Sequence, residues 1–207
     1  MTRRAFSRCA AVAMGLVVTG AVAFETPAAR SSFAPSQWHL DIERAMDIVG
    51  VAPGMVVGEA GAGDGYFTLP MARRVGPTGL VYANDISTRA LGSLEEHAAR
   101  EGLANIRTVV GEVADPRFPR RDLQLVVVVH AFHDFSRPVE WLVNLKSYLR
   151  PGGTVAIIDR DPEQGAESHF WTRARIADCA AEAGYELTLA TYDVSQHLIM
   201  VFRPTER

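Results

Sequence analysis

Residues 55–68 read MVVGEAGAGDGYFT, a short apolar run that enters a glycine-rich turn. The last three glycines stand at alternate positions, and residues without a Cβ let the backbone turn tightly and approach a ligand closely. The spacing is G-x-G-x-G rather than the G-x-G-x-x-G of dinucleotide-binding folds, and no Lys-Ser/Thr pair follows as in a phosphate-binding loop. Because Glu59 and Asp64 would repel a pyrophosphate, the turn favours a cationic ligand.

The chain on either side of this turn alternates short apolar runs with amphipathic segments. Apolar, β-branched runs predict seven strands, at 55–57, 80–83, 106–110, 123–129, 154–158, 185–192 and 197–202. Helical periodicity predicts helices at 36–49, from the glycine turn to 75, 87–101, from 136 or 137 to a stop at 151–153, and 166–183. Ser87 is the expected cap of the third helix, with Thr88 as the alternative.

The order of these elements predicts the fold class. Strands separated by helices indicate a doubly wound, Rossmann-like α/β fold with right-handed crossovers and three αβα layers. The sheet is expected to be mostly parallel and seven-stranded, with an antiparallel edge hairpin formed by the last two strands. The apolar run at 123–129, in which Gln124 is the one polar residue, is typical of a central parallel strand.

In such a sheet, ligands bind beyond the carboxyl ends of the strands, where the strand order reverses. Three polar segments fall at such ends in addition to the glycine turn. Asp85 ends the second strand, Glu112 follows the third within Gly-Glu-Val, and residues 130–134 (His-Ala-Phe-His-Asp) follow the fourth. A carboxylate at position 85 suits a pair of ribose hydroxyls, because an ionised acceptor strengthens both hydrogen bonds.

The pattern Glu59-x-Gly-x-Gly-x-Gly65, Asp85, the Leu-Arg-Pro-Gly-Gly segment at 149–153 and the strand order resemble the class I S-adenosylmethionine-dependent methyltransferases. The resemblance covers about residues 50–203 and is closest to a bacterial subgroup whose members often carry export signals. It implies a methyltransferase that uses S-adenosyl-L-methionine as its cofactor.

The resemblance also assigns cofactor-binding roles to eight residues. These are Glu59 for the methionine amino group, the backbone of Gly61 and Gly63 for the methionine and ribose, Gly65 as the third glycine of the cofactor-binding turn, Asp85 for the ribose hydroxyls, Ile86 and Val113 for the adenine ring, and Glu112 for the adenine amino group. Two positions depart from the family pattern. Glu112 stands where Asp is more common, and His130 stands where many relatives carry Asp or Asn.

The expected catalytic residues are His130, His133 and Asp134. A sulfonium methyl group is already activated, so the protein mainly aligns a nucleophile with the bond that breaks. A base is needed only when the nucleophile arrives protonated, and either histidine suits that task, with Asp134 orienting one of them. The alternative is that one histidine only closes the end of its strand by hydrogen bonding.

No metal site is predicted. His130, His133, Asp159, Asp161 and His169 carry ligand chemistry that suits a divalent ion, but no sequence motif brings them together. The expected partner is a small-molecule methyl acceptor, because the segments between the elements leave little room for a substrate lid. The formal net charge of −3 disfavours nucleic acid.

Residues 1–23 have a different composition from the rest. Three arginines among the first eight residues precede an uncharged apolar run, and Ala-Val-Ala at 21–23 offers the small residues that signal peptidase reads. This pattern predicts a cleaved secretory signal. The Thr-Arg-Arg-Ala-Phe start resembles a twin-arginine signal, which exports folded proteins.

The expected mature protein is a methyltransferase domain at 36–207 that follows a linker at 24–35. Its expected location is the periplasm, without stable membrane insertion, or the cytoplasm if the signal does not work. Because S-adenosylmethionine is made in the cytoplasm, the alternative function is an exported, non-catalytic module that binds this cofactor or another nucleoside.

Overall fold

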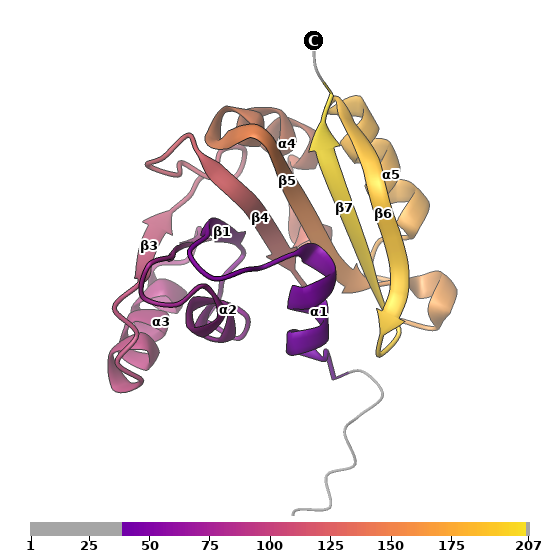
Figure 1. Ribbon diagram of the computed structural model, residues 1–207. Coiled ribbons are helices and arrows are strands. Elements are labelled where there is room, and N and C mark those ends of the chain that lie inside the picture. Colours follow the sequence, from indigo (N-terminus) through magenta and orange to yellow (C-terminus); the bar gives the residue numbers. More distant parts are fainter. Residues whose placement is uncertain (1–38, 206–207) are drawn as a thin grey trace, which may run out of the picture. The chain divides into compact units, whose positions relative to one another are not determined.

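A computed structural model describes residues 39–205, which lie within one unit spanning residues 35–207 (Figure 1). The predicted signal at 1–23 and linker at 24–35 lie outside the described residues. Seven strands form one sheet: β1 (Val56–Ala60), β2 (Leu80–Asp85), β3 (Ile106–Val110), β4 (Leu123–Val129), β5 (Leu149–Arg160), β6 (Tyr185–Val194) and β7 (His197–Pro204). The α-helices of the described part are α1 (Ile42–Val49), α2 (Thr68–Val75), α3 (Thr88–Arg100), α4 (Pro138–Leu145) and α5 (Arg173–Glu182).

The strand order is β3-β2-β1-β4-β5-β7-β6. The first five strands pair in parallel, whereas β7 lies antiparallel between β5 and β6. The expected doubly wound, mostly parallel sheet with an antiparallel hairpin at its edge is therefore confirmed. The order reverses between β1 and β4, so the crevice for a ligand is expected beyond the carboxyl ends of these two strands.

Helices cover both faces of the sheet, and β4 contributes to both cores. Helices α1, α2 and α3 pack on one face, and α4 and α5 pack on the other (Figure 1). Successive side chains of a strand point to opposite faces. Accordingly, Leu125 and Val127 pack with the first group of helices, and Val126 and Val128 pack with the second. The prediction that 123–129 is a central strand is confirmed.

Three predicted helix boundaries are wrong. Helix α1 begins at Ile42 because the Asp41 side chain caps it by accepting a hydrogen bond from the Arg44 amide at 3.0 Å. Helix α5 begins at Arg173, not 166, because the Thr172 hydroxyl caps it in the same way. Helix α4 ends at Leu145 and is followed by the 3-10 turn η2 (Lys146–Tyr148).

The Pro-Gly-Gly segment at 151–153 lies inside β5, whereas the sequence predicted that it stops the preceding helix. Gly152 has φ +73°, and the pairing of β4 with β5 shifts register between Leu123 and Leu125. A Cβ at Gly153 would lie 2.8 Å from the Leu123 carbonyl oxygen. The two glycines therefore let the strand bend while it stays close to β4.

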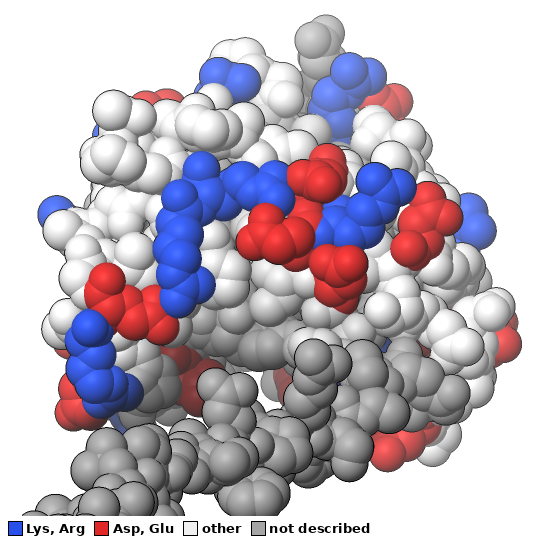
Figure 2. Space-filling model, turned by 60° about the horizontal axis from the view of Figure 1, so that its bottom comes forward, with Lys and Arg blue, Asp and Glu red and all other residues white. Residues whose placement is uncertain are grey.

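Charged side chains on the helical surface are paired across elements. Arg74 of α2 forms ion pairs with Glu43 and Asp47 of α1, and Arg73 pairs with Glu101 at the end of α3. On the face shown in Figure 2, basic and acidic side chains are interspersed rather than gathered by sign. Within residues 39–205, no helix has both the length and the apolarity needed to cross a bilayer.

Candidate functional site

The glycine turn after β1 packs directly against the segment after β4. Gly61, Gly63 and Gly65 have φ values of +74°, +55° and +104°, a region that favours glycine. A Cβ at Gly61 would lie 2.4 Å from the Cβ of Ala131, well inside van der Waals contact. The backbone of the glycine turn therefore carries no side chain at Gly61, where the carboxyl ends of β1 and β4 meet.

Asp85 fixes the shape of this turn from the end of β2. Its Oδ2 accepts a hydrogen bond from the Gly63 amide at 2.9 Å, and its Oδ1 accepts one from the Ser87 amide at 2.8 Å. Ser87 in turn caps α3 through the Ala90 amide, as predicted. Each carboxylate oxygen has a second lone pair, so Asp85 can hold the loop and still accept bonds from a ligand.

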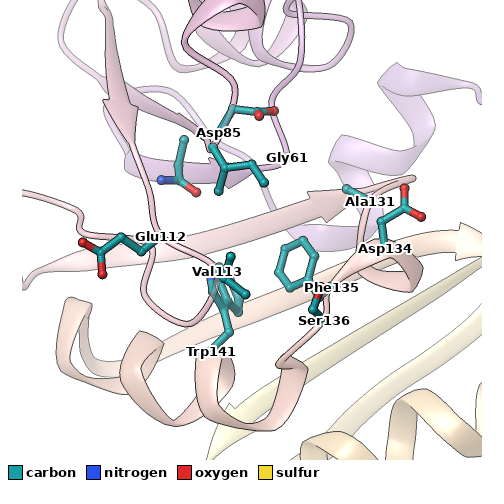
Figure 3. A pocket seen from close by; sticks show the side chains of 11 residues that line it. Gly61, Asp85, Glu112, Val113, Ala131, Asp134, Phe135, Ser136 and Trp141 are labelled. Carbon is teal, nitrogen blue, oxygen red and sulfur yellow. The ribbon is translucent and has the colours of Figure 1, made fainter.

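A pocket of about 240 Å³ opens beside this turn (Figure 3). It is lined by Gly61, Asn84, Asp85, Ile86, Glu112, Val113, Ala131, Asp134, Phe135, Ser136 and Trp141. Ile86 and Val113 are unusually exposed for aliphatic side chains, at 65% and 49%, and so offer apolar surface to a flat ring. The lining comes from the ends of β1 to β4, as the strand-end rule predicts.

Six predicted site residues line the pocket and five do not. Those that line it are Gly61, Asp85, Ile86, Glu112, Val113 and Asp134, and those that do not are Glu59, Gly63, Gly65, His130 and His133. Glu112 lies at the rim, where it is paired with Arg117, and its carboxylate is turned away from the other lining side chains (Figure 3).

Glu59 lies in the core of the turn. It is 2% exposed, and the hydroxyl of Thr68, at the start of α2, donates a hydrogen bond to its Oε2. Burial raises the pKa of Glu59 to about 8, the Thr68 hydrogen bond opposes this shift, and the charge of Asp85 adds to it. Glu59 therefore connects β1 to α2 inside the protein, and its expected contact with a methionine amino group stays a prediction.

Sequence reasoning missed Asn84, Phe135, Ser136 and Trp141 as lining residues. Asn84 is 4% exposed, and its Nδ2 donates to the carbonyls of Val109 and Pro116, at 3.2 and 2.7 Å. It thereby joins β2 to the loop after β3. Two features of the sequence could have indicated these residues: Asn84 directly precedes Asp85, and residues 135–136 directly follow the segment at 130–134 after β4.

The two candidate histidines occupy different environments. His130 has φ +51°, and its Nε2 is buried with no hydrogen-bond partner among the described residues. Burial, and then the neighbouring His197, lower the pKa of His130 to about 4, and the two rings lie 4.9 Å apart. His133 lies in the 3-10 turn η1 (Phe132–Asp134), and its Nδ1 is 2.7 Å from Oδ2 of the buried Asp159.

The remaining side chains considered for a metal site are engaged elsewhere. Asp161 accepts hydrogen bonds from the Tyr192 hydroxyl at 2.5 Å and the Glu163 amide at 2.9 Å. His169 lies 3.3 Å from Glu167 on an exposed segment. Among residues 39–205, no group of three or more His, Cys, Asp or Glu side chains is placed to hold a metal ion.

The part of the chain that forms this pocket is similar to known proteins. Residues 57–153 match the family model described as a methyltransferase domain. A crystal structure of an S-adenosylmethionine-dependent methyltransferase from Aquifex aeolicus aligns with a TM-score of 0.72 at 22% identity. The alignment covers 79% of this chain and 88% of that one. The structural match supports the fold, and the family model covers the strands whose ends form the pocket.

Curated relatives match over the same part of the chain. A nocamycin O-methyltransferase from Saccharothrix syringae is 30% identical over 114 residues, which is 55% of this chain and 41% of that protein. A tRNA (guanine(6)-N2)-methyltransferase from Thermus thermophilus is 32% identical over 124 residues, 53% of this chain and 35% of the relative. The chain thus spans less than half the length of either relative.

Proposed function

We propose that this chain, which carries a class I S-adenosylmethionine-dependent methyltransferase domain at residues 57–153, transfers the methyl group of S-adenosylmethionine to a small-molecule acceptor. The observation that carries the proposal is the pocket at the β1/β4 switch point. It combines a glycine turn that packs closely against the segment after β4, a carboxylate at the end of β2 and two exposed aliphatic side chains.

The residues of the pocket fit this cofactor. Gly61 lines the pocket with backbone alone, because a side chain there would collide with Ala131, and Asp85 retains acceptor capacity for ribose hydroxyls. Ile86 and Val113 would pack on the adenine ring. Glu112 would reach the adenine amino group only after leaving Arg117, so its binding role requires an ion pair to open.

The protein's part in the reaction is mainly positioning. S-adenosylmethionine supplies a methyl group that its sulfonium already activates. Phe135 and Trp141 exclude water from one wall of the pocket, and Asp85 holds the glycine turn in one shape. Holding an acceptor in line with the bond that breaks accounts for several kcal/mol of the barrier, because the entropy of orientation is lost before reaction.

A small acceptor is favoured over a nucleic acid. The face in Figure 2 carries interspersed charges, whereas polyanion binding depends on a continuous positive surface. The named activities of the relatives include both an antibiotic O-methyltransferase and a tRNA methyltransferase. The acidic net charge of −3 supports the first class of acceptor for this chain.

Calorimetric titration of S-adenosylmethionine into the full chain tests the cofactor site. Asp85→Ala removes charge-assisted bonds worth about 1.5–3 kcal/mol each, so we expect at least a 30-fold weaker affinity, or roughly 2 kcal/mol. Glu96→Ala, which removes a carboxylate that is 78% exposed on α3 and does not line the pocket, is the control and is expected to bind like wild type. Folded wild-type protein that does not bind, or equal binding by Asp85→Ala, would refute the proposal.

We further propose that residues 1–23 direct export by the twin-arginine route. Replacing Arg3 and Arg4 by lysine and fractionating cells tests this export route, because retention in the cytoplasm is expected only for a twin-arginine signal.

The rival non-catalytic function predicts tight S-adenosylmethionine binding with no methyl transfer to any small hydroxyl, amine or thiol. Multiple turnovers with one such acceptor would exclude it.

A further inference from the structure

The turn after β4 places His133 between two pocket-lining neighbours. Ala131 and Asp134 line the pocket, and His133 stands between them in η1 with its ring directed at the end of β5. Its Nδ1 lies 2.7 Å from Oδ2 of Asp159, which is fully buried. Oδ1 of the same carboxylate accepts the Arg160 amide at 2.9 Å, so both oxygens of Asp159 are fixed.

This arrangement determines which ring nitrogen carries the proton. A carboxylate can only accept, so Nδ1 of His133 must donate to Asp159. In the neutral ring, Nε2 therefore holds the lone pair. Nε2 lies 3.6 Å from Oδ2 of Asp134, whose side chain is 81% exposed and lines the pocket. The basic nitrogen thus faces the side on which a pocket-lining carboxylate meets solvent.

The surroundings of His133 favour its charged form. Burial lowers the pKa of His133, but the hydrogen bond and charge of Asp159, together with the charge of Asp134, outweigh burial and raise the pKa above its ordinary value of 6.5. Arg160 opposes this shift. The other groups that face the ring are His130 nearby, and His169 and Phe170, whose rings lie 5.4 and 4.6 Å from it.

His130 is unsuited to the same task. In the described part of the chain its Nε2 is buried without a partner, and the buried Asp159 carboxylate bonds to His133 instead.

Resting on the proposed function, we propose that His133 is the general base of methyl transfer, that Asp159 is its positioning residue, and that the acceptor is a weakly acidic hydroxyl. The hydroxyl oxygen forms the bond to the methyl carbon as the C–S bond breaks, and the C–S electron pair stays on sulfur. The hydroxyl proton passes to Nε2 of His133. The two carboxylates then flank the imidazolium, which later releases the proton to water.

Nitrogen-15 NMR of histidine-labelled full-length protein tests the arrangement without an acceptor. Wild-type His133, assigned with His133→Gln, is expected to be protonated on Nδ1 in its neutral form and to titrate above pH 6.5. In Asp159→Asn the amide can donate to Nδ1, which moves the proton to Nε2 and lowers the midpoint. Asp134→Asn is the control and keeps the wild-type tautomer. A wild-type ring protonated on Nε2, or no change in Asp159→Asn, overturns the proposal, and the first of these readouts needs no variant to fold.

A pair of probe acceptors tests the base itself. Phenol is protonated near neutral pH and needs a base, whereas thiophenol ionises there unaided. We expect His133→Gln to slow methylation of phenol at least 100-fold and to leave methylation of thiophenol within about threefold. The acid limb of the phenol profile should move to lower pH in Asp159→Asn. Equal loss with both probes, or phenol methylation that survives in His133→Gln, overturns the proposal.

Calorimetry separates this inference from the proposed function. His133→Gln and Asp159→Asn are expected to bind S-adenosylmethionine within about threefold of wild type, because neither side chain lines the cofactor pocket. Wild-type protein that does not bind the cofactor contradicts the proposed function. Normal cofactor binding by a wild-type protein whose His133 is protonated on Nε2 contradicts only the proposal that His133 is the general base.

Discussion

Replacing Glu59 by glutamine should change how the stability of the protein depends on pH. Glu59 is 2% exposed, and burial raises its pKa from an ordinary value of 4.5 to about 8. Between these values the native state holds a proton that the unfolded state has lost. The stability that Glu59 contributes is therefore complete below pH 4.5 and is lost as the pH rises toward 8.

The magnitude follows from the linkage relation. One proton difference changes the free energy of unfolding by about 1.4 kcal/mol per pH unit, so wild type should lose about 2.7 kcal/mol between about pH 5.5 and about pH 7.5 through this residue alone. Glutamine cannot ionise and keeps the carboxyl shape. The stability of Glu59→Gln relative to wild type should therefore rise by this amount across the same interval.

Urea unfolding at a series of pH values measures the difference. Thr68→Val should steepen the loss at alkaline pH, because the Thr68 hydroxyl donates to the ionised carboxylate and holds the pKa of Glu59 down. Glu96→Gln, whose carboxylate side chain is 78% exposed, is the control and should stay within about 0.5 kcal/mol of wild type. Parallel curves for wild type and Glu59→Gln would refute the reasoning.

Two further predictions concern backbone packing and a buried hydroxyl. Gly61→Ala should destabilise the protein by about 1–3 kcal/mol and abolish cofactor binding, because the new Cβ would lie 2.4 Å from the Cβ of Ala131. Gly92→Ala is the control, because Gly92 lies in open space on α3, and it should stabilise the protein by about 0.5–1 kcal/mol. Thermal unfolding measures both, and equal effects would contradict the packing argument. Tyr185→Phe should cost about 1–2 kcal/mol in urea unfolding, because it leaves the Leu142 carbonyl without its 2.9 Å partner, and an unchanged midpoint would count against that bond.

The sequence predicted those elements whose signal is local. The bounds of β3 and β4 were predicted correctly, because apolar or β-branched residues make up each strand apart from one polar side chain, Arg107 in β3 and Gln124 in β4. The Ser87 cap was also found, since a capping side chain acts within one turn. The bend at 151–153 was misread because Pro-Gly-Gly usually ends an element. Here its continuation as a strand depends on pairing with Leu123, which is distant in the sequence.

The candidate site was predicted from the sequence in part. The strand-end rule brought Asp85, Glu112 and Asp134 to one pocket, because it depends only on strand order. Burial was not foreseen, and it removes Glu59 from the pocket surface. The partnership of His133 with Asp159 was not predictable either. It requires the register between β4 and β5, which sets how the turn after β4 meets Asp159 near the end of β5.

The position of β7 has a consequence for synthesis on the ribosome. This strand is the last element of the described chain, yet it lies between β5 and β6 and pairs with both. Until residues 197–204 leave the exit tunnel, β5 has an open edge and β6 has no strand to join. A nascent chain that stops before His197 would expose that edge to other unfinished chains or to proteases. Docking of β7 thus covers the open edge of β5 and gives β6 its partner strand in a single step.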